Sequence, residues 1–130
     1  MCNIGVFIGE AFKKYSFPDR PLGGERIEAF WKILKKERMV EEKDIKIIAP
    51  VMATDNLLLL FHKKEFLDFV KDASKLGFIY LNPILCFGGD TPAFKGIFEA
   101  ACYVVGSTLL GLDMIMKKEF NHIFNPIGGM

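Results

Sequence analysis

The chain has 130 residues, of which 51% are hydrophobic, so it is long enough to bury one core of its own and falls near the common domain size of about 100 to 150 residues. Its 17 lysine and arginine residues nearly cancel its 16 acidic residues. This balance excludes a global field that would favour nucleic acid or an anionic membrane. We expect a single domain over residues 1–130 with no nucleic-acid partner.

The cysteines and the N-terminus indicate a cellular compartment. Cys2, Cys86 and Cys102 are an odd number without C-x-x-C spacing, which argues against a disulfide framework and a structural zinc site. The N-terminus lacks the basic region and cleavage site of a signal peptide. The longest uncharged run, 100–112, is shorter than the roughly 20 apolar residues of a membrane span. We expect a cytoplasmic protein without a membrane partner.

Three short apolar runs are predicted as strands. Residues 3–8 are rich in β-branched side chains and are typical of a strand buried on both faces. A second strand is predicted at 45–49, and a third strand, expected to be buried, at 122–125. The segments 78–81 and 83–87 fit either a strand or merely extended chain.

Helices are expected between these strands. Residues 9–24 are predicted as a loop because prolines and glycines prevent a regular helix there. Apolar stripes at helical spacing then predict helices over 25–38, 54–60, 63–75 and 93–118.

Individual residues mark the ends of these helices. Thr54 is a plausible N-cap and Gly77 a plausible C-cap. Pro92 is predicted in the first turn of the longest helix, where its missing N–H is not required. Small residues such as Gly106 and Ser107 allow close approach to neighbours, so this helix is expected to be buried over much of its length.

Alternation of apolar strands with amphipathic helices indicates an α/β domain with a short, mostly parallel sheet flanked by helices. Ligands of open parallel sheets bind beyond the carboxyl ends of the strands. The loop after the first strand, the glycine-aspartate turn at 88–90 and the glycines at 128–129 are all expected at that edge.

Considered alone, the candidate catalytic side chains give no active site. His62 and His122 are the two histidines, and no third nitrogen or sulfur ligand has the spacing of a catalytic zinc site. His62 is expected to be structural at the join of two helices, and His122 to begin the last strand. Cys86 and Cys102 are expected to be buried small hydrophobes. Ser107 lies mid-helix without a base, so nucleophilic catalysis has no support.

Four collinear segments resemble the histone deacetylase and acetoin-utilisation protein family, at 15–26, 53–66, 88–92 and 125–129. The resemblance implies the N-terminal part of the deacetylase fold, a partial three-layer sandwich. For a complete member it implies zinc-dependent hydrolysis of an acetylated amine of the acetyl-lysine type. In the family a histidine pair would follow directly after the position of Met130, and the zinc ligands come later still. The resemblance therefore implies no catalytic residue, no metal ligand and no cofactor in this chain.

The resemblance also implies substrate-binding residues, each with a structural alternative. Asp90 matches a rim aspartate that accepts hydrogen bonds from substrate N–H groups, and it is equally suited to cap a helix. Arg26 matches an arginine deep in an internal cavity, and its alternative is a surface residue that opposes the helix dipole. Gly128 and Gly129 match glycines that line the acetyl pocket, and otherwise form a flexible tail.

The sequence and the resemblance lead to two candidate functions of different classes. The first is the N-terminal portion of a deacetylase-like amidohydrolase, truncated or split, inactive alone and completed by a C-terminal deacetylase portion. The alternative is a stand-alone, non-catalytic α/β module that self-associates or binds a protein partner. Three strands leave an apolar edge that pairs with other chains unless it is covered, so a homodimer or higher oligomer is expected.

Overall fold

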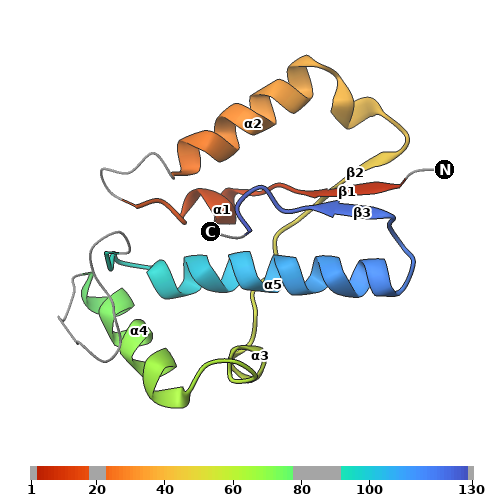
Figure 1. The fold of residues 1–130 in the computed structure, drawn as a ribbon. Coiled ribbons are helices and arrows are strands. Elements are labelled where there is room, and N and C mark those ends of the chain that lie inside the picture. The colour runs from red at the N-terminus through yellow and green to blue at the C-terminus, as the bar shows by residue number, and fades with distance from the viewer. Residues whose placement is uncertain (1–2, 18–22, 78–91, 129–130) are drawn as a thin grey trace.

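The computed structural model describes residues 3–17, 23–77 and 92–128 (Figure 1). Three strands, β1 (Ile4–Phe7), β2 (Ile45–Ile48) and β3 (His122–Phe124), form a parallel sheet in the order β2-β1-β3. The expected α/β class with a short parallel sheet is confirmed.

Strand β1 occupies the centre of the sheet and is buried, as its apolar run predicts. Val6 and Phe7 are buried. A Cβ atom on Gly5 would lie 2.5 Å from Ile123 Cδ1 and 2.6 Å from Ile48 Cδ1. Glycine at position 5 therefore lets the side chains of both neighbouring strands meet over the middle of the sheet.

Strand β3 differs from the expected buried strand. His122 and Phe124 are exposed, and 48% of Phe124 is accessible. Within the described residues β3 pairs with β1 alone and so lies at the edge of the sheet. An apolar run cannot by itself distinguish a central strand from an edge strand, which explains the error.

Helices cover both faces of the sheet (Figure 1). The ring of Phe30 in α2 (Gly24–Lys36) meets the ring of Phe124 edge-on at 5.5 Å between centroids. On the other face, α5 (Ile97–Met116) approaches so closely that a Cβ atom on Gly111 would lie 2.7 Å from Ile123 Cγ2. The expected partial three-layer arrangement is confirmed.

Two short helical turns were not expected. The predicted loop at 9–24 contains α1 (Glu10–Lys13), and η1 (Met39–Glu41) is a 3₁₀ turn after α2. Phe12 of α1 is fully buried and packs in one cluster with Phe7 and Ile27. The prolines that argue against a helix all follow α1, so burial of Phe12 decides the local structure.

The two helices that follow β2 have the predicted caps. In α3 (Asp55–Leu58) the Thr54 hydroxyl accepts a hydrogen bond from the Leu57 N–H at 3.4 Å. Helix α4 (Lys64–Leu76) ends at Gly77, whose φ of 74° is the left-handed conformation that glycine adopts without strain. Helix α3 is shorter than predicted, and its last expected residues form a turn.

The longest helix begins later in the sequence than predicted. Pro92 and Ala93 are not helical, and α5 begins at Ile97 after Gly96, which has a φ of 88°. Ser74 of α4 supplies the reason: its carbonyl accepts from the Gly96 N–H and its hydroxyl from the Phe98 N–H, both at 3.1 Å. A tertiary contact therefore replaces the expected cap at 90–91, which lies outside the described residues.

Helix α5 is also less buried than expected. Its buried small residues lie on two faces, with Ala100, Ser107 and Gly111 on one and Gly106 on another. Another face exposes four apolar side chains that follow one another after four, three and four residues (a 4-3-4 spacing), namely Val105, Leu109, Leu112 and Met116. Exposure reaches 57% at Leu112 and 74% at Met116, so the expectation of a helix buried over much of its length is wrong for this face.

The chain that leaves β2 crosses directly over α5. A Cβ atom on Gly106 would lie 2.4 Å from both the Val51 carbonyl oxygen and the Ala53 nitrogen. The Val51 N–H donates to Ser107 Oγ at 3.1 Å, and the Ala53 N–H donates to the Cys102 carbonyl at 2.9 Å. This crossing confirms the predicted close approach at the small residues.

Replacing Gly106 with alanine tests the crossing. The added methyl group meets backbone atoms, which cannot rotate away, so we expect Gly106→Ala to lower the free energy of unfolding by about 1 to 3 kcal/mol, the usual cost of overpacking. Urea unfolding followed by circular dichroism measures the change. Leu112→Ala, on the exposed face of the same helix, is the control and should cost less. Equal effects of the two variants would contradict the crossing.

Candidate functional site at the carboxyl edge of the sheet

The parallel strands bring three chain segments to one edge of the sheet. Segment 8–13 follows β1, segment 49–53 follows β2, and segment 125–128 follows β3. The start of α2 lies against the first of these, because a Cβ atom on Gly24 would be only 2.7 Å from the Lys13 carbonyl oxygen. This is the edge at which open α/β sheets bind their ligands.

Asn125 fixes the turn that follows β3. Its Nδ2 donates to Thr108 Oγ1 at 2.9 Å and to the Val104 carbonyl at 3.3 Å, and its Oδ1 accepts from the Ile127 N–H at 3.3 Å. The Thr108 hydroxyl donates in turn to the Val104 carbonyl at 2.9 Å. One amide side chain thus links the turn at 125–128 to the middle of α5.

Gly128 closes this turn. Its N–H donates to the Asn125 carbonyl at 3.2 Å. A Cβ atom at this position would lie 3.0 Å from Asn125 Nδ2 and 3.1 Å from Thr108 Oγ1, which is tight. The side chain of Asn125 therefore favours glycine at 128, while one side of Gly128 stays exposed.

Arg26 lies in the first turn of α2 with an exposed side chain. Its neighbour Ile27 is buried in the cluster of Phe7 and Phe12, and Ile127, the neighbour of Gly128, packs against the same cluster. The structure therefore brings the segments that carry Arg26 and Gly128 together around one core. The internal-cavity role of Arg26 stays a prediction. Asp90 and Gly129 lie outside the described residues.

The described residues do not supply a zinc site. Within 3–17, 23–77 and 92–128, no group of three or more histidine, cysteine, aspartate or glutamate side chains could hold a metal ion. His62 lies between α3 and α4, where its ring contacts the rings of Phe61 and Phe66, each at 5.0 Å between centroids. His122 begins β3 at the opposite end of the strand from the turn at 125–128. Both positions agree with the predictions for these residues.

Cys102 has the environment of a buried hydrophobe. It is 2% exposed and belongs to a cluster with Ala53, Leu58 and Leu67. Burial raises the pKa of its thiol to about 11, and the carboxylates of Asp55 and Glu99 act in the same direction. The thiol is neutral at physiological pH and is not an activated nucleophile. Cys86 lies outside the described residues.

Neither Asn125 nor its partner Thr108 was expected to have a role of its own from the sequence. A signal was present, since an Asn-Pro pair directly after a strand is a common turn signal and asparagine side chains bond the backbone two residues later. The contact with Thr108 spans 17 positions and depends on how α5 packs against the sheet.

The fold and this edge define a parallel α/β domain with a side-chain-anchored turn beyond its last described strand. Residues 20–130 match the histone deacetylase domain, and the chain therefore belongs to this family. The chain is 30% identical to the acetoin utilization protein AcuC of Bacillus subtilis over 130 aligned residues, which cover 96% of this chain and 33% of that protein. It is 26% identical to a probable deacetylase of Archaeoglobus fulgidus, with 94% of this chain and 32% of that protein covered.

These matches confirm the resemblance to the N-terminal portion of the family. The chain spans about a third of the length of the curated relatives it matches. Activity, substrate and partners of a whole family member are therefore proposals for this chain.

One helix among the described residues, α5, is long and apolar enough to cross a membrane by length and composition alone. The central helix of a soluble α/β domain meets the same criteria. Gly106 and Gly111 of α5 pack against the segment after β2 and against the sheet. The absence of a membrane partner stays a prediction.

Replacing Asn125 with aspartate tests the anchored turn. The carboxylate of Asn125→Asp keeps the acceptor for Ile127 and loses both donated hydrogen bonds, so we expect a loss of about 1 to 2 kcal/mol in the free energy of unfolding. Urea unfolding and amide hydrogen exchange at Ile127 and Gly128 measure it. Asn121→Asp, an exposed position just before β3, is the matched control. Unchanged exchange at 127–128 in Asn125→Asp would refute the anchoring role.

Proposed function

We propose that this chain forms the N-terminal portion of a zinc-dependent, deacetylase-like amidohydrolase that acts on acetylated amines of the acetyl-lysine type, and that it is inactive alone. The observation that carries the proposal is the match of residues 20–130 to the histone deacetylase domain. The described residues add support, because they form a layered α/β scaffold (Figure 1). The proposed setting is the cytoplasm.

In this proposal the chain contributes substrate contacts and no catalytic group. Asp90 accepts hydrogen bonds from the substrate backbone at the rim. Gly128 and Gly129 let the backbone approach the acetyl group, and the anchored turn supports this role because Asn125 holds Gly128 against α5. Arg26 supplies a cation that attracts the released acetate, and its neighbour Ile27 belongs to the same core cluster.

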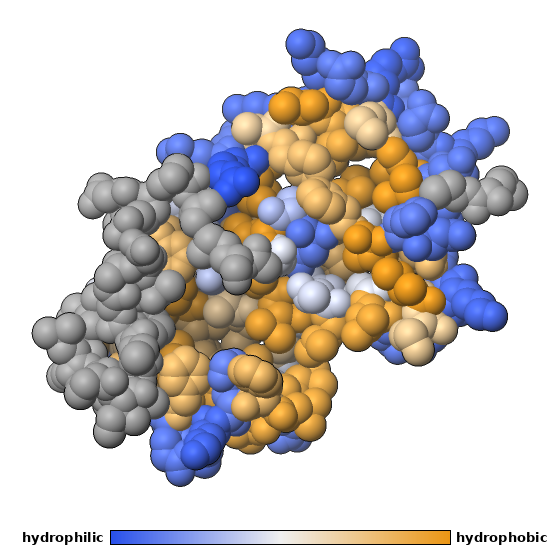
Figure 2. Space-filling model, viewed as in Figure 1, coloured by the Kyte–Doolittle hydropathy of each residue, from blue (hydrophilic) through white to orange (hydrophobic). Residues whose placement is uncertain are grey.

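The proposed partner is a C-terminal deacetylase portion that holds the zinc ion and the histidine pair. Such a partner has apolar surface to cover on this chain. The exposed 4-3-4 stripe of α5 runs through Leu109, Leu112 and Met116, and Phe61 in the turn after α3 is 89% exposed. Figure 2 shows hydrophobic residues gathered in the middle of the face that it presents, with hydrophilic residues mostly around them. Exposed apolar area of this kind marks a protein interface.

Complementation tests the main proposal. The chain alone is expected to bind no stoichiometric zinc and to show no turnover of a fluorogenic acetyl-lysine peptide. The chain is then co-expressed with a fragment of the Bacillus subtilis relative that begins after the region aligned with this chain. This combination should restore zinc-dependent turnover. In that complex Asp90→Asn should lower kcat/KM about 10- to 100-fold, the effect of losing a hydrogen bond to a charged group.

The matched control is Asp72→Asn, which removes an exposed carboxylate paired with Lys75 on α4 and should leave kcat/KM unchanged. If the isolated chain bound stoichiometric zinc and turned over the peptide, the proposal would be wrong. A complex that forms and turns over, but responds equally to both substitutions, would remove Asp90 from the substrate rim.

The second candidate is a stand-alone, non-catalytic module that self-associates, and the exposed stripe of α5 favours it. Its 4-3-4 spacing is that of a helix-packing seam. In this case light scattering after gel filtration should give at least a dimer, and Leu112→Glu should dissociate it because a charge cannot be buried in an apolar seam.

The control for self-association is Ile33→Glu, which places the same charge on an exposed apolar position of α2, on the opposite face of the sheet. It should leave the dimer intact. A compact monomer of the unmodified chain at high concentration would exclude self-association and leave the complementation proposal standing.

A further inference from the structure

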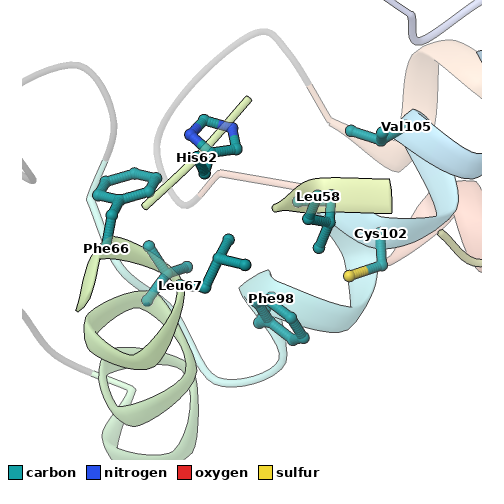
Figure 3. A pocket seen from close by; sticks show the side chains of 9 residues that line it. Leu58, His62, Phe66, Leu67, Phe98, Cys102 and Val105 are labelled. Atoms are coloured by element: carbon teal, nitrogen blue, oxygen red, sulfur yellow. The ribbon is translucent and has the colours of Figure 1, made fainter. Parts of the chain in front are cut away.

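A small apolar cavity lies where α3, α4 and α5 meet, apart from the carboxyl edge of the sheet. Its volume is about 100 Å³, and it is partly open to solvent. Figure 3 shows Leu58 from the first of these helices, Leu67 from the second and Cys102 from the third around a common space. The cavity is therefore built by tertiary packing of three separate elements.

The walls of the cavity are part of the core. Leu58, Leu67 and Cys102 are buried in one hydrophobic cluster, and Phe66 and Phe98 pack against that cluster. Residues of this cluster keep fixed positions because they are packed on several sides. The cavity is thus a preformed space, which is the usual state of small-ligand sites.

The lining is almost free of polar groups. Its polar side chains are the thiol of Cys102, which is neutral, and the imidazole of His62, which meets the Phe61 ring edge-on and the Phe66 ring at a tilt of 30°. The nearby cation Lys71, whose Nζ lies 5.0 Å from the centre of the Phe98 ring, is paired with Asp55. A charged ligand would find no free counter-charge among these groups and would lose its hydration.

The size of the cavity limits the ligand further. Pockets for drug-sized molecules and cofactors occupy roughly 300 to 1,000 Å³. A dry apolar cavity of about 150 Å³ accepts benzene or xenon. A partly open space of about 100 Å³ is suited to a guest no larger than these.

We propose that this cavity binds one small, uncharged, predominantly apolar molecule, no larger than about a benzene ring. The guest gains dispersion contacts with Leu58, Leu67 and Val70 that water cannot provide. The site uses none of the residues assigned to the substrate, and it adjoins the exposed stripe of α5 through Val105.

Methyl-resolved NMR of the full chain tests the proposal, with xenon and benzene as the probes. Each probe should shift the methyl resonances of Leu58, Leu67, Val70 and Val105 in a saturable manner. Each should also raise the unfolding temperature with rising concentration, because a guest that binds the folded state stabilises it. Saturable shifts confined to these methyl groups support the site.

The variant Ala101→Leu should fill the cavity and abolish the saturable shifts, since Ala101 lines the space. Ala29→Leu makes the same change at an exposed position of α2 and should retain them. Should Ala101→Leu fail to fold, Ala101→Val should weaken the response at least several-fold. The proposal is overturned by absent or non-saturable shifts in the unmodified chain, or by equal responses of the filled variant and the control.

Discussion

The crossing of α5 by the chain that leaves β2 is the constraint on which the rest of the structure depends. At Gly106 the backbone of 51–53 lies where a side chain would stand, and hydrogen bonds to Ser107 and Cys102 hold it there. The crossing joins the sheet to the helix on one side and leads into α3 on the other. The segment that crosses α5 also contributes to the carboxyl edge of the sheet, and Ala53 at its end belongs to the cluster around the cavity.

Helix α5 consequently serves several neighbours with different faces. Gly111 packs against the sheet, and Thr108 and Val104 accept hydrogen bonds from Asn125. At the start of the helix, the Phe98 N–H donates a hydrogen bond to Ser74 of α4. The face with Leu112 and Met116 meets none of these and remains exposed.

The carboxyl edge shows how the segments that carry two of the proposed substrate residues, Arg26 and Gly128, are supported. The turn that ends at Gly128 is held by a side chain, Asn125, and by the packing of Ile127 on the core of Phe7 and Phe12. The segment with Arg26 reaches the same core through Ile27. Positions 100 residues apart in the sequence are thus fixed to one hydrophobic cluster, so the geometry of this edge depends on the core as a whole.

The sequence by itself determined the features that depend on near neighbours. These are the apolar run of β1, the Thr54 cap, the left-handed Gly77 and the family motifs, because each involves interactions within a few residues. The tertiary structure decided the start of α5, which Ser74 sets from another helix, and the helical turn that buries Phe12. It also decided the edge position of β3, the partner of Asn125 and the exposed face of α5. Local patterns show which side chains are apolar, but only the packed fold determines which of them have a neighbour.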